Sequence, residues 1–178
     1  WSQSLQVSTL TNLLNSGKTV LTSLIIEKAQ KNLPVSVLFF YCKHKDTERS
    51  RFVAIARAIL AQLLVQNKDE DLLPFLYDQS LDSGEIELLS SQLCNSLLKA
   101  AFESLPLDAK IYLIIDGIDE CEPQERRQIL TTFSSLIADT DQPGRVRGIF
   151  VSQDEPDIKG LLRAAVNIRI TASDTEDD

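Results

Sequence analysis

The stretch from Ile111 to Ile115 constrains the fold of this chain most, because consecutive aliphatic and aromatic residues lead directly into Asp116. A strand without polar alternation is typical of the centre of a parallel α/β sheet, where both faces are covered. Asp116 is then expected at the carboxyl end of the strand, where open α/β sheets bind ligands. A carboxylate there can hold Mg²⁺ against a nucleotide phosphate, and Asp119 and Glu120 can orient or deprotonate a water. The alternative is a buried strand that ends in a solvated acidic turn.

Hydrophobic patterns predict further strands at 4–11, 35–41, 146–151 and 166–170, with segments of helical period between them. Parallel strands need crossover connections, which are usually helices. The alternation therefore predicts an α/β fold in three layers, in which a parallel β-sheet carries helices on both faces.

Three details of this pattern can be checked individually. The first helix is expected to end before Pro34 and to have Val20, Leu21, Leu24 and Ile25 on its apolar face. The acidic segment 67–84 contains Pro74 and is expected to be a connection with a short helical turn at most. The helix after it is expected to turn inward the residues Ile86, Leu89, Leu93, Leu97 and Ala100.

Composition limits the classes of partner. The net charge of −8 leaves no basic excess for a broad nucleic-acid surface or an anionic membrane. The three cysteines are widely spaced, which favours free thiols in a reducing compartment, and we expect a cytoplasmic protein. No segment reaches the roughly 20 apolar residues of a membrane span. We expect residues 1–172 to form one nucleotide-binding core of a longer chain, and 173–178 to be an acidic tail or the start of the next segment.

Gly17-Lys18-Thr19 opens the first helix and matches the second half of a P-loop, or Walker A motif, GxxxxGK[ST]. Amides of such a loop surround phosphate oxygens, the lysine reaches the outer phosphates, and the hydroxyl binds Mg²⁺. Asn12 stands where the first glycine is expected, and Asn15 stands where many such loops carry another. Asparagine tolerates the positive φ that these loops use. We therefore interpret the segment from Asn12 to Thr19, which includes Ser16, as an altered P-loop. A chance Gly-Lys-Thr at a helix start is the alternative.

The chain resembles the NACHT domain of the STAND class of P-loop NTPases, especially the nucleotide-binding modules of large fungal multidomain proteins. Four stretches carry the resemblance: Ser16–Leu21, Ala56–Leu64, Leu113–Cys121 and Ile149–Ile158. The Asp-Gly-Ile-Asp-Glu-Cys sequence inside the third is the most specific. The resemblance implies a core that binds ATP or GTP with Mg²⁺ and acts as a slow switch in signal transduction of the innate-immunity type.

The resemblance also implies roles for individual residues. Lys18 would contact the β- and γ-phosphates, Thr19 would ligate Mg²⁺, and Asp116 would be the Walker B acid. Asp119 and Glu120 would position water. Ser152 and Gln153 match the sensor position, where many relatives have arginine, and Gln153 can hydrogen-bond a γ-phosphate without offsetting its charge, so slow hydrolysis is expected.

Two functions remain open from the sequence. In the first, nucleotide state controls self-association and the activation of an effector through other domains of a longer chain, of the helical, winged-helix, repeat and effector kinds. In the second, a degenerate P-loop domain is a non-catalytic interaction scaffold. Whether the chain is an enzyme is therefore open. If it is, it is a slow NTPase.

Overall fold

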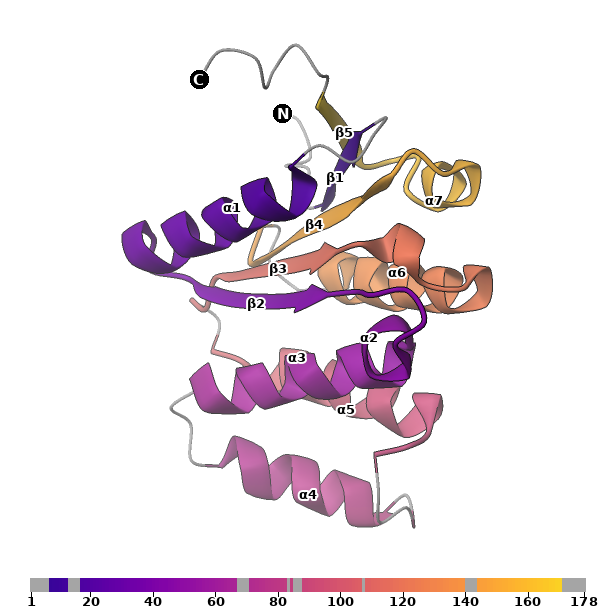
Figure 1. Cartoon of the computed structure of the whole chain (residues 1–178). Helices are drawn as coiled ribbons and strands as arrows, with labels where there is room; N and C mark the ends of the chain where they lie inside the picture. Colours follow the sequence, from indigo (N-terminus) through magenta and orange to yellow (C-terminus); the bar gives the residue numbers. More distant parts are fainter. Residues whose placement is uncertain are drawn as a thin grey trace.

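The computed structural model describes residues 7–12, 17–66, 71–82, 84, 88–106, 108–139 and 144–170. Five parallel strands form one sheet in the order β2-β3-β4-β1-β5 (Figure 1). The strands are β1 (Val7–Asn12), β2 (Ser36–Tyr41), β3 (Ile111–Asp116), β4 (Val146–Gln153) and β5 (Val166–Ile170). The α/β fold with a parallel sheet, predicted from the alternation of strands and helices, is confirmed.

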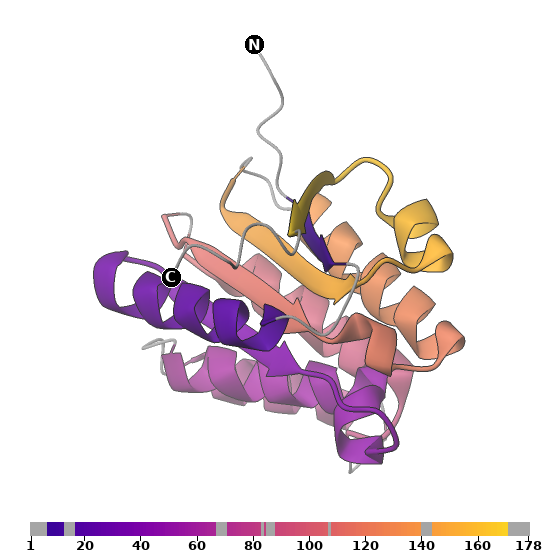
Figure 2. The same cartoon turned by 45° about the horizontal axis from the view of Figure 1, so that its top comes forward.

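Helices cover both faces of this sheet (Figures 1 and 2). One face carries α1 (Lys18–Asn32), whose Ile26 and Ala29 pack on Val37 of β2 and Ile114 of β3. The other face carries α3 (Phe52–Gln66), α5 (Ser91–Ser104) and α6 (Pro123–Ala138). Because successive strand residues point to opposite faces, a strand as apolar as β3 supplies both cores at once.

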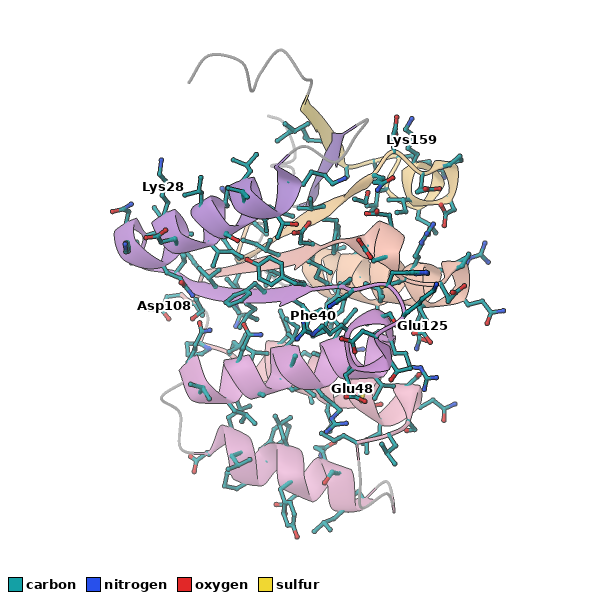
Figure 3. The ribbon with its side chains drawn as sticks, viewed as in Figure 1. Lys28, Phe40, Glu48, Asp108, Glu125 and Lys159 are labelled. Atoms are coloured by element: carbon teal, nitrogen blue, oxygen red, sulfur yellow. The ribbon has the colours of Figure 1, made fainter. Side chains whose placement is uncertain are left out.

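The larger core lies on the second face. Phe40 points from β2 toward α3, as Figure 3 shows. The rings of Phe52 in α3 and Phe133 in α6 lie 6.3 Å apart between their centroids. The five α6 residues predicted to face inward are all buried: Ile129, Leu130, Phe133, Leu136 and Ile137.

Two glutamines of α3 form hydrogen bonds with the outer edge of β2. The side-chain amide of Gln62 donates to the carbonyl of Phe39 at 2.8 Å and accepts from its amide at 3.0 Å, and Gln66 donates to the carbonyl of Val37 at 3.0 Å. An edge strand with unpaired backbone groups is a template for pairing with another chain. These side chains satisfy the carbonyl of Val37 and both backbone groups of Phe39 within the molecule.

The structure differs from the sequence-based expectation on α1. Val20 and Leu24 are 66% and 47% exposed, and the buried residues are Thr22, Ile26 and Ala29. The expected apolar face was therefore wrong for Val20, Leu21 and Leu24, because the helix rests on β2 and β3 further along its length. Ile25 is partly buried and packs against this core, as expected.

A second difference lies between α3 and α5. Leu72–Asp82 forms a helix, α4, which lies beyond α3 and α5 on the side away from the sheet (Figure 1). The prediction of a connection here was wrong because Pro74 lies in the first helical turn, where its missing N–H costs no hydrogen bond. The next helix begins only at Ser91, and Leu89 is 63% exposed instead of facing inward, while Ile86 lies outside the described residues.

Shorter elements complete the described structure: α2 (Thr47–Ser50), the 3₁₀ turn η1 (Ile118–Glu120) and α7 (Pro156–Leu161). Within the described ranges, no helix combines the length and the apolar character needed to cross a membrane. The predicted bounds of the domain and of its acidic tail stay a prediction, since residues 171–178 lie outside those ranges.

The strand order creates a topological switch point. β4 lies between β1 and β3, with Asn12 opposite Gln153 and Asp116 opposite Val151. The chain leaves β1 toward the face covered by α1 and leaves β3 and β4 toward the face covered by α6 and α7. Ligands of open α/β sheets bind outside the carboxyl ends of strands at such a change of direction.

Candidate nucleotide-binding site

Gly17 begins α1 at the carboxyl edge of the sheet. Its φ of 69° and ψ of 2° are left-handed, and its carbonyl accepts the amide of Leu21 at 2.8 Å, the first bond of the helix. Glycine is favoured in this conformation because it has no Cβ. The predicted loop residues Asn15 and Ser16 lie outside the described residues.

Asp116, the last residue of β3, meets the start of α1. Asp116 is 3% exposed. Burial raises the pKa of Asp116 above its ordinary value, while the Thr19 hydroxyl, the Gly117 amide and the charge of Lys18 act in the opposite direction. The two halves of the predicted site are thus brought together in space.

Asn12 is the last residue of β1, paired in register with Gln153 on one side and Ile170 on the other. Its backbone is therefore extended, and the structure gives no support to the expectation that Asn12 occupies a loop position of positive φ. Among the described residues, the non-glycine residue with positive φ is Lys45, at 60°.

The two acids after Asp116 are each engaged by a backbone amide. Oδ1 of Asp119 accepts the amide of Gln153 at 2.9 Å, which ties η1 to the end of β4. Oε2 of Glu120 accepts the amide of His44 at 2.8 Å, which ties η1 to the loop after β2. One carboxylate oxygen of each side chain thus fixes the turn.

Ser152 lies beside this turn at the carboxyl edge of β4. It is 1% exposed, and its hydroxyl oxygen has no hydrogen-bond partner among the described residues. Buried polar groups nearly always have a partner, from the protein or from a bound molecule. The side chain of Gln153 is exposed, so the two predicted sensor residues differ in environment.

A cavity of about 610 Å³ opens on the far side of Glu120. The loop after β2 and the start of α6 line it, and its lining includes the basic residues Lys45 and Arg51, His44, and the acids Glu122 and Glu125. Glu125 also accepts the amide of Phe52 at 2.7 Å, which joins the beginnings of α6 and α3, and Figure 3 shows its position.

Two features of this edge were not foreseen from the sequence. The Cys42 thiol lies beside that of Cys121, and hydrogen bonding to Cys121, followed by burial, raises the pKa of Cys42 above its ordinary value. Arg126 binds the backbone of the turn through the carbonyls of Asp119 and Cys121. The sequence offered one indication that Arg126 is not a surface residue, since it shares a helical face with the buried Ile129 and Leu130.

The donor set at Asp116 fits Mg²⁺. A carboxylate and a hydroxyl are hard oxygen ligands, and Mg²⁺ in nucleotide sites takes one or two protein carboxylates together with phosphate oxygens and waters. In the part of the chain that the structure describes, no group of three or more His, Cys, Asp or Glu side chains could hold a metal ion.

Comparison with known families gives one match by sequence. The model of the family described as nephrocystin 3, N-terminal, matches residues 2–153, most of the chain. The chain belongs to this family. The match includes the P-loop segment, the acidic turn and the end of β4, so every residue of the candidate site lies inside the family region. No curated protein sequence matches the chain.

Several solved structures share the fold of this nephrocystin 3 N-terminal family member. They are Cdc6p from Pyrobaculum aerophilum (17% identity, TM-score 0.56), a Walker-type ATPase of Pyrococcus abyssi (11%, 0.53) and the Aeropyrum pernix ORC2 protein in ADPNP and ADP complexes (14%, 0.51). The comparisons cover 92%, 94% and 94% of this chain but 38%, 49% and 42% of those chains. At these identities the likeness shows the fold alone.

Proposed function

We propose that this domain binds ATP or GTP with Mg²⁺ and serves as a slow nucleotide switch within a longer protein. The observation that carries the proposal is the position of the buried Asp116 beside Thr19 and the charge of Lys18 at the start of α1. A buried carboxylate whose charged form is disfavoured gains most when a cation arrives next to it. Mg²⁺ with a triphosphate supplies that cation and neutralises charge on the phosphates during transfer.

Each side of the topological switch point has a separate task in this proposal. The start of α1 presents Lys18 and the helix amides to phosphate oxygens. Thr19 and Asp116 hold Mg²⁺. The carboxylate oxygens of Asp119 and Glu120 that do not bind the protein backbone orient or deprotonate the attacking water, and Ser152 and Gln153 face the outer phosphate from β4.

The finer assignment, to the NACHT type of the STAND class, is also part of the proposal. It is supported by the Asp-Gly-Ile-Asp-Glu-Cys turn and by the match of residues 2–153 to a family of N-terminal regions. Slow hydrolysis would control self-association and effector activation through helical, winged-helix, repeat and effector domains of a longer chain, in the cytoplasm. The similar ORC2 protein of Aeropyrum pernix was solved in complexes with ADPNP and ADP, which favours an adenine nucleotide as the first to test.

Thermal unfolding with and without Mg²⁺ and nucleotide tests the proposal. At a nucleotide concentration about 100 times Kd, binding stabilises the folded state by about 2.7 kcal/mol, which raises the melting temperature by about 5–10 °C for a chain of this size. Lys18→Ala should abolish the shift, and Lys28→Ala, an exposed lysine of the same helix, should keep it. No shift at millimolar ATP or GTP in the native chain would overturn the proposal.

One observation favours the alternative of a non-catalytic scaffold. The carboxylates of Asp119 and Glu120 already accept backbone amides, a structural role that needs no nucleotide. Calorimetric titration of ATP and GTP into the native chain and into Asn12→Gly/Asn15→Gly separates the two functions. Heat of binding in the double variant alone would support the scaffold.

A further inference from the structure

Arg126 lies where three segments meet: the first turns of α6, the acidic turn (Gly117–Cys121) and the beginning of α7. Its side chain is only 14% exposed. Nε donates to the carbonyl of Cys121 at 2.7 Å and Nη2 donates to the carbonyl of Asp119 at 2.6 Å. Nη1 is 3.4 Å from Oδ2 of Asp157 and 3.9 Å from Oε2 of Glu155, two acids at the start of α7.

The chemistry of arginine explains why one residue can join these segments. Guanidinium presents several N–H donors in a fixed plane, so it can bind two carbonyls on one side and a carboxylate on another at the same time. Lysine has a single nitrogen on a flexible stem and cannot reproduce this arrangement. Hydrogen bonds from a charged donor in a part-buried site are stronger than those between neutral groups.

Asp119 is consequently held from two directions. Arg126 binds its carbonyl, and the amide of Gln153 binds its carboxylate. Gln153 ends β4 and is followed within three residues by α7, whose acids bind Arg126. A displacement of α7 therefore reaches Asp119 both along the backbone of β4 and through the guanidinium.

We infer that Arg126 is a positioning residue that fixes the acidic turn and couples its geometry to the position of α7. This inference rests on the proposed function and adds a means of regulating the same site. A partner or a neighbouring domain that pulls on α7 would shift Asp119 and Glu120 relative to the water that they orient, and the rate of hydrolysis would change while binding of the phosphates at α1 would not.

Four variants test the inference in the full chain. Arg126→Ala removes all contacts, and Arg126→Lys keeps only the charge. Glu155→Gln/Asp157→Asn releases α7 while leaving the two carbonyl bonds intact. Arg127→Ala is the matched control, because Arg127 is the next residue of the same helix and is exposed.

Hydrogen exchange provides a readout that needs no nucleotide. The amides of Glu120 and Cys121 are bonded within the turn, to the carbonyls of Gly117 and Ile118. We expect the exchange of these two amides to be about tenfold faster in Arg126→Ala. A hydrogen bond from a charged group stabilises the closed turn enough to change its opening equilibrium by about that factor. Smaller increases are expected in Arg126→Lys and in the double variant, and none in Arg127→Ala. Equal exchange in Arg126→Ala and Arg127→Ala, or an unchanged turn in the double variant, would overturn the inference.

Steady-state hydrolysis of ATP or GTP separates positioning from folding. Arg126→Ala and the double variant should lower kcat by about tenfold with KM changed less than about twofold, since the phosphate contacts at α1 remain. Arg126→Lys should restore part of kcat. An unchanged kcat in both would overturn the inference. If the native chain binds no nucleotide, the proposed function fails and the exchange experiment alone decides the coupling. If Arg126→Ala does not fold, Arg126→Lys and the double variant decide it.

Discussion

The backbone amide of Gln153 donates to Oδ1 of Asp119 at 2.9 Å, so that the last residue of β4 holds a carboxylate that follows β3. The bond joins the two strands at the edge where a ligand is expected. It also means that Asp119 has a structural role beside any chemical one, and the two roles can be separated by the choice of substitution.

Asp119→Asn and Asp119→Ala make this separation. Asparagine keeps an oxygen that can accept the Gln153 amide, whereas alanine leaves that amide without its partner. We expect Asp119→Ala to lower the free energy of unfolding by about 1 kcal/mol, since the bond is exposed, and Asp119→Asn to lower it by less. Urea denaturation measures both. If Asp119 also orients water, both variants should lose hydrolysis, and full activity in Asp119→Asn would assign it the structural role alone.

Asp116 predicts a dependence of stability on pH. Burial raises its folded-state pKa above the ordinary value of 3.8, so the folded chain binds this proton more tightly than the unfolded chain. The stabilisation is therefore largest at low pH and is lost as pH rises through the folded-state pKa. Asp116→Asn removes the buried charge while keeping an acceptor for Thr19, and we expect a gain in stability relative to the native chain that grows as pH rises from about 4 toward about 8.

Urea unfolding of the nucleotide-free chain across that pH range measures the effect. Asp108→Asn is the control, because Asp108 is exposed and its substitution should leave the profile unchanged. The same Asp116→Asn variant should lose the thermal shift with Mg²⁺ and nucleotide. A variant that is less stable than the native chain at the upper end of that range would contradict the assignment of burial as the main cause.

The meeting of Thr19 and Asp116 was predictable because it depends on local rules. A continuous apolar run places Asp116 at a strand end, a Gly-Lys-Thr sequence places Thr19 at a helix start, and parallel strands bring both to one edge. The contacts of Arg126 were not predictable in the same way. Its partners are the backbone carbonyls of Asp119 and Cys121. Every residue has such a carbonyl, so the sequence does not indicate which ones accept a hydrogen bond from Arg126, and these two come within reach only once the turn and α6 are packed.

Helix α4 shows a different limit of prediction from the sequence. Its apolar residues were visible, but Pro74 and the surrounding acids resembled a connection, and a proline in a first turn is distinguished from one in a loop only by where the helix begins. The exposure of Val20 and Leu24 has a similar origin, because periodicity identifies an apolar face of α1 but not which part of it rests on the sheet.

The packing of α4 can be tested with adjacent residues. Leu76 is 6% exposed and belongs to the main core, whereas Tyr77 is 60% exposed. We expect Leu76→Ala to lower the free energy of unfolding by about 2–4 kcal/mol, through loss of buried area and the cavity left behind. Tyr77→Ala should change it by less than about 0.5 kcal/mol, as surface substitutions usually do. Equal effects in denaturant titrations would show that α4 does not pack as described.

The acidic turn depends on the absence of a side chain at Gly117. Its φ is 76°, and a Cβ there would lie 3.2 Å from the carbonyl oxygen of Cys42 and 3.3 Å from Cγ of Glu120. The carbonyl belongs to the backbone that follows β2, so it cannot easily move aside. We expect Gly117→Ala to lower the free energy of unfolding by about 1–3 kcal/mol, from the left-handed backbone and the close contact together.

Gly160 in α7 supplies the control for this substitution. Its added Cβ would meet nothing within 4 Å, and alanine in a helix is favoured over glycine by about 0.5–1 kcal/mol, so Gly160→Ala should be neutral or stabilising. Because the strain at Gly117 acts on the turn that carries Asp119 and Glu120, hydrolysis should fall further in Gly117→Ala than the loss of folded protein explains. Denaturant titration and a rate normalised to folded protein check the two effects. A Gly117→Ala variant as stable as Gly160→Ala would show that the turn tolerates a side chain there and is less rigid than its contacts imply.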